Sequence, residues 1–313
     1  MITFGPVPSR RLGQSLGINN IPPKICSYSC IYCQIGRTIK MEIDRKEHYD
    51  TDLILQDVHS RTDKVRSGGD KIDYLTFVPD GEPTLDINLG REIDLLGQFG
   101  IKIAVITNSS LLWSEEVRKV LLKADWVSVK VDATDEETWR KINRPYPGLK
   151  LEYILDGIIE FSKMYSGVLT TETMLVKDIN DGEGQIEEIA RYLANIKPAR
   201  AYLSIPTRPP AERNVQPPTE ENINRSYQIF NEYLENVEYL VGYEGNAFAF
   251  TGDIEEDILS ITAVHPMRED AVRSFLDRSG SDWVIIEKLI TEGKLVEIKY
   301  MDWHFYLRKI NPD

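Results

Sequence analysis

Hydrophobic and polar residues alternate in two patterns along the first two thirds of the chain. Short runs rich in β-branched and aromatic residues predict strands, and longer stretches between them have the apolar spacing of amphipathic helices. The predicted strands are 15–21, 73–79, 101–107, 126–131, 169–176 and 201–206. The predicted helices include 48–66, 114–124, 151–165 and 183–196. This alternation predicts a parallel α/β sheet, curved or closed like a barrel, with ligands at the carboxyl ends of the strands.

The pattern changes near residue 252. Three short helical units follow, separated by Pro266 and Gly280, and two alternating runs at 295–300 and 303–309 face each other across a two-residue turn. Helices followed by a hairpin are typical of a small winged-helix module. The sequence therefore predicts a core domain over residues 1–250 and a winged-helix-like domain over residues 251–313.

The charge of this module argues against the usual use of a winged helix, which is to bind nucleic acid. Residues 251–313 contain 8 Lys or Arg and 13 Asp or Glu, whereas a nucleic-acid reader is normally basic. We therefore favour a module that covers the barrel mouth or contacts another protein. Its aromatic residues Trp283, Trp303 and Phe305 are the candidates for such contacts.

Composition and charge limit the class of protein. The 35.9 kDa chain has 37 basic and 50 acidic residues, a net charge of −13, so its overall field does not attract nucleic acid. No apolar run approaches the roughly 18 to 20 residues that span a bilayer, and the first residues lack the order of a signal peptide. We expect a cytoplasmic protein that has no membrane partner.

All three cysteines, Cys26, Cys30 and Cys33, lie in one short stretch. Thiolates suit zinc, copper(I) or iron–sulfur clusters. A closed zinc site would need a fourth ligand, and the nearest histidine, His48, lies 15 residues beyond Cys33. A [4Fe–4S] cluster with three thiolates leaves one iron open to an external ligand. We favour that cluster over three cysteines packed as small apolar residues.

Two motifs resemble those of the radical SAM superfamily. The cysteine spacing is C-x3-C-x2-C, with Tyr32 directly before the third cysteine. The segment FVPDGEPTL resembles the superfamily's Gly-Gly-Glu motif: Gly81 and Glu82 match its last two positions, and Asp80 replaces the first glycine.

A narrower resemblance covers roughly residues 3–215, and it is to wyosine-synthase-like radical SAM oxidoreductases. The segments that carry it are GPVPSRRLGQSLGIN, CQIGRT, DGEPTL, ITNSSLL, INRP, MLVKDIND and PTRPPAE. The chain has no fourth cysteine for an auxiliary cluster, which true wyosine synthases carry, so the narrower resemblance says little about the substrate. The same absence excludes the usual machinery of sulfur insertion and methyl transfer through a protein cysteine.

The resemblance implies a partial (β/α)6 radical SAM barrel and an enzyme of the oxidoreductase or transferase type. One [4Fe–4S] cluster per chain would be held by Cys26, Cys30 and Cys33, and its open iron would bind S-adenosylmethionine (SAM). An electron from a flavodoxin- or ferredoxin-type donor would cleave SAM to a 5′-deoxyadenosyl radical, which abstracts hydrogen from a substrate. Those cofactors supply the difficult chemistry, and the protein positions them.

Candidate SAM contacts come from the motifs and the strand ends. Gly81 would let backbone groups approach the methionine amine, and Glu82 would accept a hydrogen bond from it. The full set is Tyr32, Gly81, Glu82, Asn108, Ser128, Lys130, Asp132, Glu172 and Met174. For Glu172 and Met174, plain alternation of polar residues on one face of a strand is an equal explanation.

Four arginines could ring the barrel mouth and hold a substrate carboxylate or phosphate. They are Arg10, Arg11, Arg144 and Arg208. The alternative is that they lie over apolar neighbours on the surface. The four histidines, at 48, 59, 265 and 304, have no triad or metal spacing, so we expect them to be structural.

Three functions remain open. The first is a radical enzyme whose substrate is a protein or peptide, docked partly by the C-terminal module. The second is a tRNA-modifying enzyme of wyosine type, which the resemblance supports and the charge and cysteine count oppose. The third is an Fe–S-dependent DNA-binding regulator, which the barrel motifs oppose.

Overall fold

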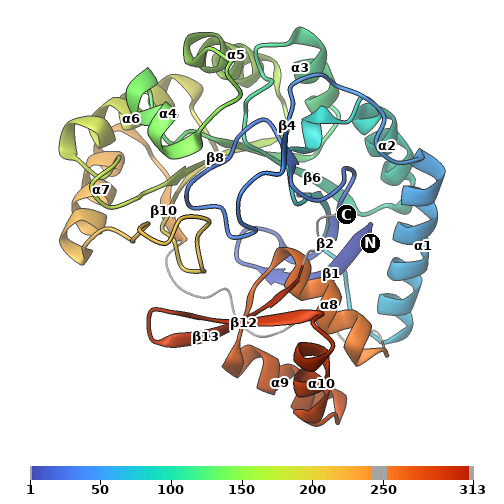
Figure 1. Ribbon diagram of the computed structural model, residues 1–313. Helices are drawn as coiled ribbons and strands as arrows, with labels where there is room; N and C mark the ends of the chain where they lie inside the picture. Colours follow the sequence, from blue (N-terminus) through green and yellow to red (C-terminus); the bar gives the residue numbers. More distant parts are fainter. Residues whose placement is uncertain (1, 241–247, 249–251, 310–313) are drawn as a thin grey trace.

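The computed structural model describes residues 2–240, 248 and 252–309. Within this part of the chain, a curled eight-stranded sheet forms an open partial barrel with helices along its outer side (Figure 1). A second, small sheet with its own helices follows. No helix in the described ranges is both long and apolar enough to cross a membrane.

The large sheet has the strand order β1-β2-β5-β6-β7-β8-β9-β10. All neighbours from β2 to β10 are parallel, and β1 pairs antiparallel with β2. The strands are β1 (Thr3–Ser9), β2 (Gly13–Ile18), β5 (Tyr74–Phe77), β6 (Lys102–Thr107), β7 (Trp126–Lys130), β8 (Val168–Met174), β9 (Arg200–Ser204) and β10 (Val237–Leu240). The six predicted strands are confirmed, and the two edge strands β1 and β10 add to them.

Helices cover the outer side of this sheet. They are α1 (Thr51–Ser67), α2 (Leu89–Leu96), α3 (Glu115–Leu121), α4 (Glu136–Asn143), α5 (Leu151–Met164), α6 (Glu183–Ile196) and α7 (Glu220–Tyr233), with 3-10 turns η1 (Pro83–Leu85) and η2 (Gly97–Phe99). The four predicted helices are confirmed, and α3 begins after Ser114 as expected. Side-chain caps start others: Asp135 accepts from the backbone of Thr138, and Thr219 accepts from that of Asn222.

One apolar core joins the sheet to these helices. It includes Leu16, Phe77, Val105, Val127 and Leu203 from five strands of this sheet, all fully buried. Burial of side chains of this size stabilises the fold by roughly 1.5 to 3 kcal/mol each. The strands are therefore fixed, and the loops at their carboxyl ends can carry polar groups without disturbing the core.

Residues 252–309 form three helices and three strands: α8 (Ile254–Val264), β11 (Met267–Arg268), α9 (Glu269–Ser279), α10 (Val284–Thr291), β12 (Leu295–Tyr300) and β13 (Trp303–Arg308). The predicted hairpin is confirmed as β12–β13, and β11 adds a short third strand beside β13. This part has its own apolar cluster, which includes Phe275, Ile286 and Tyr306. The predicted domain boundary, between residues 250 and 251, lies outside the described residues.

Polar contacts join the C-terminal part to the barrel, among them one from α8 and one from the hairpin. Arg61 of α1 forms a buried ion pair with Asp257 of α8, with 2.7 Å between Nη2 and Oδ1. Tyr300, at the end of the hairpin, donates to the carbonyl oxygen of Pro206 in the loop after β9. The small sheet therefore lies against the open side of the barrel, next to the loop that leaves its last buried strand (Figure 1).

Candidate functional site

The three cysteines lie on a loop that is closed at its base. Strand β3 (Ile25–Cys26) pairs in parallel with β4 (Lys40–Met41), so Cys26 is directly opposite Met41. Farther along the loop, the backbone of Ile31 donates to the carbonyl oxygen of Ile142 at the end of α4. This loop therefore has fixed ends and a fixed middle, although it is an irregular segment.

Two asparagines donate hydrogen bonds to cysteine sulfurs. Asn108, which follows β6, lies 3.4 Å from the Sγ of Cys26, and Asn143, at the end of α4, lies 3.4 Å from the Sγ of Cys30. Hydrogen bonds to sulfur favour the thiolate, the form that binds metal. Burial works in the opposite direction and raises the pKa of Cys30 to about 12. A cationic iron centre would counter this cost of burial.

A cavity of about 370 Å³ opens at the carboxyl ends of the parallel strands. That volume is within the range of small-molecule and cofactor sites. The predicted site residues that line it are Arg11, Cys26, Cys30, Tyr32, Cys33, Gly81, Glu82, Asn108, Lys130, Glu172, Met174 and Arg208. Residues from both ends of the barrel sequence therefore meet at one cavity.

Gly81 and Glu82 organise the wall beside the first cysteine. A Cβ atom on Gly81 would lie 1.9 Å from the carbonyl oxygen of Ile25, so this glycine lets the motif pack directly against the strand that carries Cys26. We predicted that Gly81 lets backbone groups approach the amine of SAM, and the structure adds a close contact of Gly81 with Ile25. Glu82 Oε1 accepts from Thr84 and Thr107, and its Oε2 accepts from the backbone of Asn108. Each carboxylate oxygen has about two acceptor positions, and Oε2 accepts one hydrogen bond among the described residues, so one position on Oε2 is left for a ligand.

Asp80, which replaces the first glycine of the motif, also lines the cavity. It is almost fully buried, and its Oδ1 has no hydrogen-bond partner among the described residues. Burial raises the pKa of Asp80 to about 7. An unpartnered buried acceptor beside the cysteines fits a ligand that brings its own donor, as the ammonium group of SAM would.

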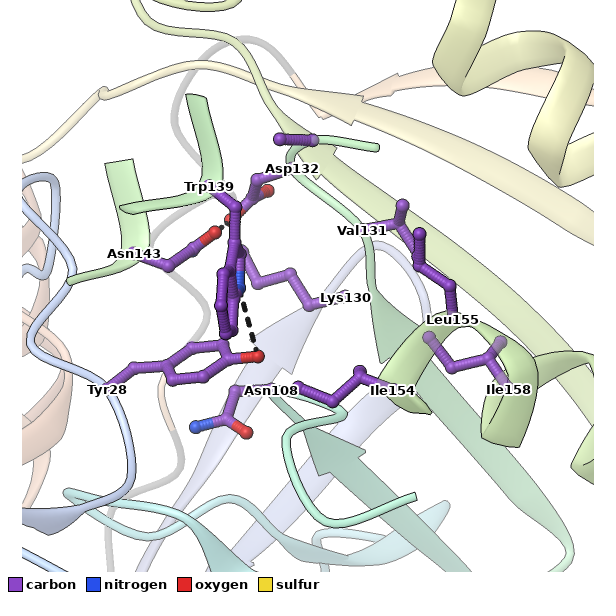
Figure 2. Close-up of a pocket in the computed structure, with 11 residues that line it drawn as sticks. Tyr28, Asn108, Lys130, Val131, Asp132, Trp139, Asn143, Ile154, Leu155 and Ile158 are labelled. Atoms are coloured by element: carbon purple, nitrogen blue, oxygen red, sulfur yellow. Dashed lines mark hydrogen bonds between the residues drawn. The ribbon is translucent and has the colours of Figure 1, made fainter. Parts of the chain in front are cut away.

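Tyr32, Asp132 and Asn143 form a buried network behind the cysteines. The hydroxyl of Tyr32 donates to Asp132 Oδ2, which also accepts from Asn143 Nδ2 at 2.7 Å. Asp132 Oδ1 accepts from the backbone of Met174 at 2.8 Å. Asp132 does not line the large cavity, and it borders a space of only about 10 Å³ with Tyr28 and Trp139 (Figure 2). In this structure the carboxylate of Asp132 is turned into the protein and positions Tyr32; the SAM contact that we predicted for Asp132 stays a prediction.

Ser128 is also absent from the cavity lining. It lies within β7 and is 1% exposed. Ser128 is on the same face of β7 as Lys130, two residues earlier in the strand, and its predicted SAM contact stays a prediction. Conversely, the sequence analysis missed Asn143 as a functional residue. Its only signal was its place in the INRP segment.

Lys130 and Glu172 form an ion pair in the cavity wall. Lys130 Nζ lies 3.0 Å from Glu172 Oε1 and above the Tyr32 ring, and Arg11 Nη1 lies 2.6 Å from Glu172 Oε2. Burial alone would raise the pKa of Glu172, but Lys130 and Arg11 lower it well below its ordinary value. Glu172 therefore stays ionised and fixes two cations that face the cavity. Ser204, at the end of β9, donates to the same carboxylate.

The four predicted arginines divide into two pairs. Arg11 and Arg208 line the cavity, and Arg208 contacts Gln34 of the cysteine loop and His265 of the C-terminal part. Arg144 is paired with Glu212 outside the cavity, and Arg10 lies in the turn between β1 and β2 without lining it. Two of the four arginines therefore line the cavity, and the substrate contact that we predicted for the four stays a prediction.

His265 lines the cavity and contacts Arg208; the structural role that we predicted for the histidines stays a prediction. His59 and His304 pair with Asp63 and Glu297 on the surface. Among the described residues, no three His, Cys, Asp or Glu side chains surround a single point as the ligands of one ion would. The cysteines of a cubane each bind a different iron, so they need not converge in that way.

Comparisons with known proteins agree with this geometry. Residues 20–193 match the radical SAM superfamily. A UPF0026 protein of Methanocaldococcus jannaschii is 50% identical over 311 residues, which cover 99% of this chain and 96% of that protein. Among solved structures, a radical SAM methyltransferase from Sphaerobacter thermophilus has a TM-score of 0.56 and 18% identity over 74% of this chain and 69% of that chain. TYW1 with a bound lysine–pyruvate adduct has a TM-score of 0.52 and 16% identity over 70% of this chain and 74% of that chain. These two structural likenesses concern the fold alone.

Proposed function

Because the chain belongs to the radical SAM superfamily and to the UPF0026 family within it, we propose that this enzyme uses one [4Fe–4S] cluster and SAM to abstract hydrogen from a protein or peptide substrate. One observation carries the proposal: the three cysteines share a single cavity with the residues of the Asp-Gly-Glu motif. When bound, the cluster and SAM supply reductive cleavage of a carbon–sulfur bond and a radical that takes a hydrogen atom.

The residues of the cavity have separate tasks in this proposal. Cys26, Cys30 and Cys33 hold three irons and leave the fourth for SAM. Asp80 and the remaining acceptor of Glu82 receive the ammonium group of SAM, which forms charge-assisted hydrogen bonds with carboxylates. These contacts orient SAM, and the buried wall around Tyr32 keeps water from the reacting atoms.

Arg11, Lys130 and Arg208 are the candidate contacts for the substrate. Glu172 holds Arg11 and Lys130 in place at 2.6 and 3.0 Å, so their positions are set before a substrate arrives. Three cations at one wall suit a carboxylate or phosphate on the substrate. This part of the proposal concerns orientation, since the hydrogen abstraction itself needs no charged partner.

The C-terminal part supports a protein or peptide substrate. We interpret residues 251–313 as a separate winged-helix-like domain that contacts a partner protein. One face of its hairpin is apolar because alternate residues share a face, and its members are Val296, Ile298, Tyr300, Trp303, Phe305 and Leu307. Val296, Ile298 and Trp303 are exposed. Trp283, by contrast, packs against Tyr306 and the apolar cluster of this part, so it is not a member of the apolar hairpin face.

Two alternatives differ from this proposal in the polymer they bind. The resemblance to wyosine-type enzymes favours tRNA, and the charge of −13 opposes it. A DNA-binding regulator would use α10 as a recognition helix, but Glu287 in this helix and Glu292 directly after it would repel the phosphate backbone.

Anaerobic incubation of the reconstituted enzyme with SAM, dithionite and separate pools of protein or tRNA tests the proposal. We expect one cluster of four irons per chain and a rise in 5′-deoxyadenosine with a protein pool. A rise with tRNA alone would select the second function. A chain that holds a full cluster but never cleaves SAM would refute the enzymatic proposal.

A further inference from the structure

The small sheet of the C-terminal part has an open edge at β12 (Leu295–Tyr300). In the strand order β11-β13-β12, this strand pairs with β13 on one side. Within the described residues, no strand pairs with its other side. Residues 296–299 are exposed. An exposed edge of this kind presents backbone donors and acceptors that another strand can bind.

The two faces of β12 differ in chemistry. Val296, Ile298 and Tyr300 lie on one face, and Glu297 and Lys299 lie on the other, because successive side chains of a strand point to opposite faces. Val296 and Ile298 are 36% and 38% exposed. The strand therefore carries an acid and a base at the surface on one face, with apolar residues at the surface on the other.

This order of residues is complementary to itself when two copies of β12 run antiparallel and meet at Ile298. In that register, Glu297 of each copy lies opposite Lys299 of the other copy. Ile298 lies opposite Ile298 of the second copy, and Val296 lies opposite Tyr300. Opposite charges and apolar side chains that face each other in this way stabilise an antiparallel pair.

The neighbouring registers do not match. A pairing that is centred on Glu297 or on Lys299 places that charge opposite the same charge of the second copy, which destabilises the pair. A shift by a single residue brings apolar side chains opposite charged ones, because it exchanges the two faces of the strand. The register centred on Ile298 satisfies both faces.

We propose that β12 is a dimerisation edge, through which two copies of this chain pair antiparallel about a twofold axis at Ile298. Two three-stranded sheets then join into one sheet of six strands. Such an interface uses the same surface of both copies, as twofold dimers do. The apolar hairpin faces of the two copies lie on the same side of the joined sheet. The inference is independent of the cluster and of SAM.

The charge order favours a second copy over another extended peptide. Any peptide could pair with the backbone of β12, but the second copy also supplies the matching acid and base. A strand of this length spans about 20 Å, so the contact lies at the small end of specific interfaces. We therefore expect a dimer that dissociates on dilution.

The test is sedimentation velocity of the full-length protein over a dilution series. The mass of the wild type should rise from 35.9 kDa toward twice that value as the concentration increases. Glu297→Lys and Lys299→Glu, each alone, should weaken self-association about tenfold or more, because each variant places like charges opposite each other twice. Circular dichroism checks the fold of each variant, since Glu297 also contacts His304 of β13.

A mixture of the two variants tests the register. One copy then has two lysines on this face of β12, and the other has two glutamates, so both charge pairs form again across the interface. The equimolar mixture should associate about as tightly as the wild type. The matched control is Lys141→Glu at an exposed position on α4, which should leave the dissociation constant within about twofold.

Three results would overturn the inference. A wild type that stays monomeric at every concentration would leave the edge of β12 to another occupant, such as the substrate protein. A dimer that neither edge variant weakens would have its interface elsewhere. A mixture that associates no better than the single variants would exclude the pairing of Glu297 with Lys299. None of these results depends on SAM cleavage, so the proposed function is tested separately.

Discussion

Replacement of Asp257 should weaken the junction between the barrel and the C-terminal part. Asp257 is fully buried and lies 2.7 Å from Nη2 of Arg61, whose side chain is 6% exposed. Arg61 Nε also donates to the carbonyl oxygen of Gly5, at 2.9 Å. Asp257→Ala removes a negative charge from a buried guanidinium that cannot lose its proton. Breaking a buried pair in this way costs about 3 to 5 kcal/mol.

Glu255 on the same helix supplies the matched control. It pairs with Lys288 at the surface, where both side chains are partly exposed. Such pairs contribute about 0 to 1 kcal/mol, so Glu255→Ala should change stability little. The double variant Arg61→Met/Asp257→Leu should recover much of the loss, because it removes both buried charges.

Urea unfolding followed by circular dichroism measures these differences. If the two parts unfold together, Asp257→Ala should shift a single midpoint to lower urea; if they separate, a new early transition should appear. A loss for Asp257→Ala no larger than that for Glu255→Ala would refute the reasoning, since the buried pair would then contribute no more than a surface pair.

Three further changes test the site and its support. Gly81→Ala should lower the melting temperature and the iron content, because the added Cβ would lie 1.9 Å from the carbonyl oxygen of Ile25. Overpacking of this kind costs about 1 to 3 kcal/mol. An unchanged melting temperature and iron content would contradict this. Asn143→Ala should increase iron loss to a chelator about 10- to 100-fold through the lost donor to Cys30, and equal retention in variant and wild type would remove Asn143 from the site. Glu92→Gln tests a pH dependence. Burial, and then the neighbouring Asp86, raise the pKa of Glu92 in the folded protein. The contribution of Glu92 to wild-type stability is therefore greatest below the ordinary carboxyl pKa, and it falls as the pH rises toward the raised pKa. The variant should therefore gain stability relative to wild type between about pH 5 and pH 8, and a constant difference in urea midpoint would contradict this.

The strands that the sequence predicted are those whose apolar runs are uninterrupted. The runs that became β6 and β7 lie in the centre of the sheet, where both faces are covered, so burial alone defines them. Strand β1 was missed because Gly5, Pro6 and Pro8 interrupt its pattern, and its pairing with β2 is irregular between Phe4 and Val7. Strand β10 is four residues long at an edge, too short to give a clear period.

The site was predictable where residues act through a local spacing. The cysteines and the pair Gly81–Glu82 are close in sequence, and their motifs carry the resemblance that implied the chemistry. Asn143 contacts Cys30 only because α4 ends beside the cysteine loop, and sequence spacing carries no such information. The same limit applies to Asp132: its place at a strand end suggested a side chain that faces the cavity, but Tyr32 and Asn143 hold the carboxylate by hydrogen bonds that the sequence does not show.

The contact between Asn143 and Cys30 also bears on the order of events during synthesis. Cys30 precedes Asn143 by 113 residues, and ribosomes add roughly 5 to 20 residues per second. The cysteines are therefore made about 6 to 20 seconds before the end of α4, which holds the middle of their loop. During that interval the cysteine loop lacks its contacts with Ile142 and Asn143. Insertion of the cluster into the native loop must therefore follow translation of α4. Chains truncated before residue 142 should accordingly retain less iron than chains that extend past α4.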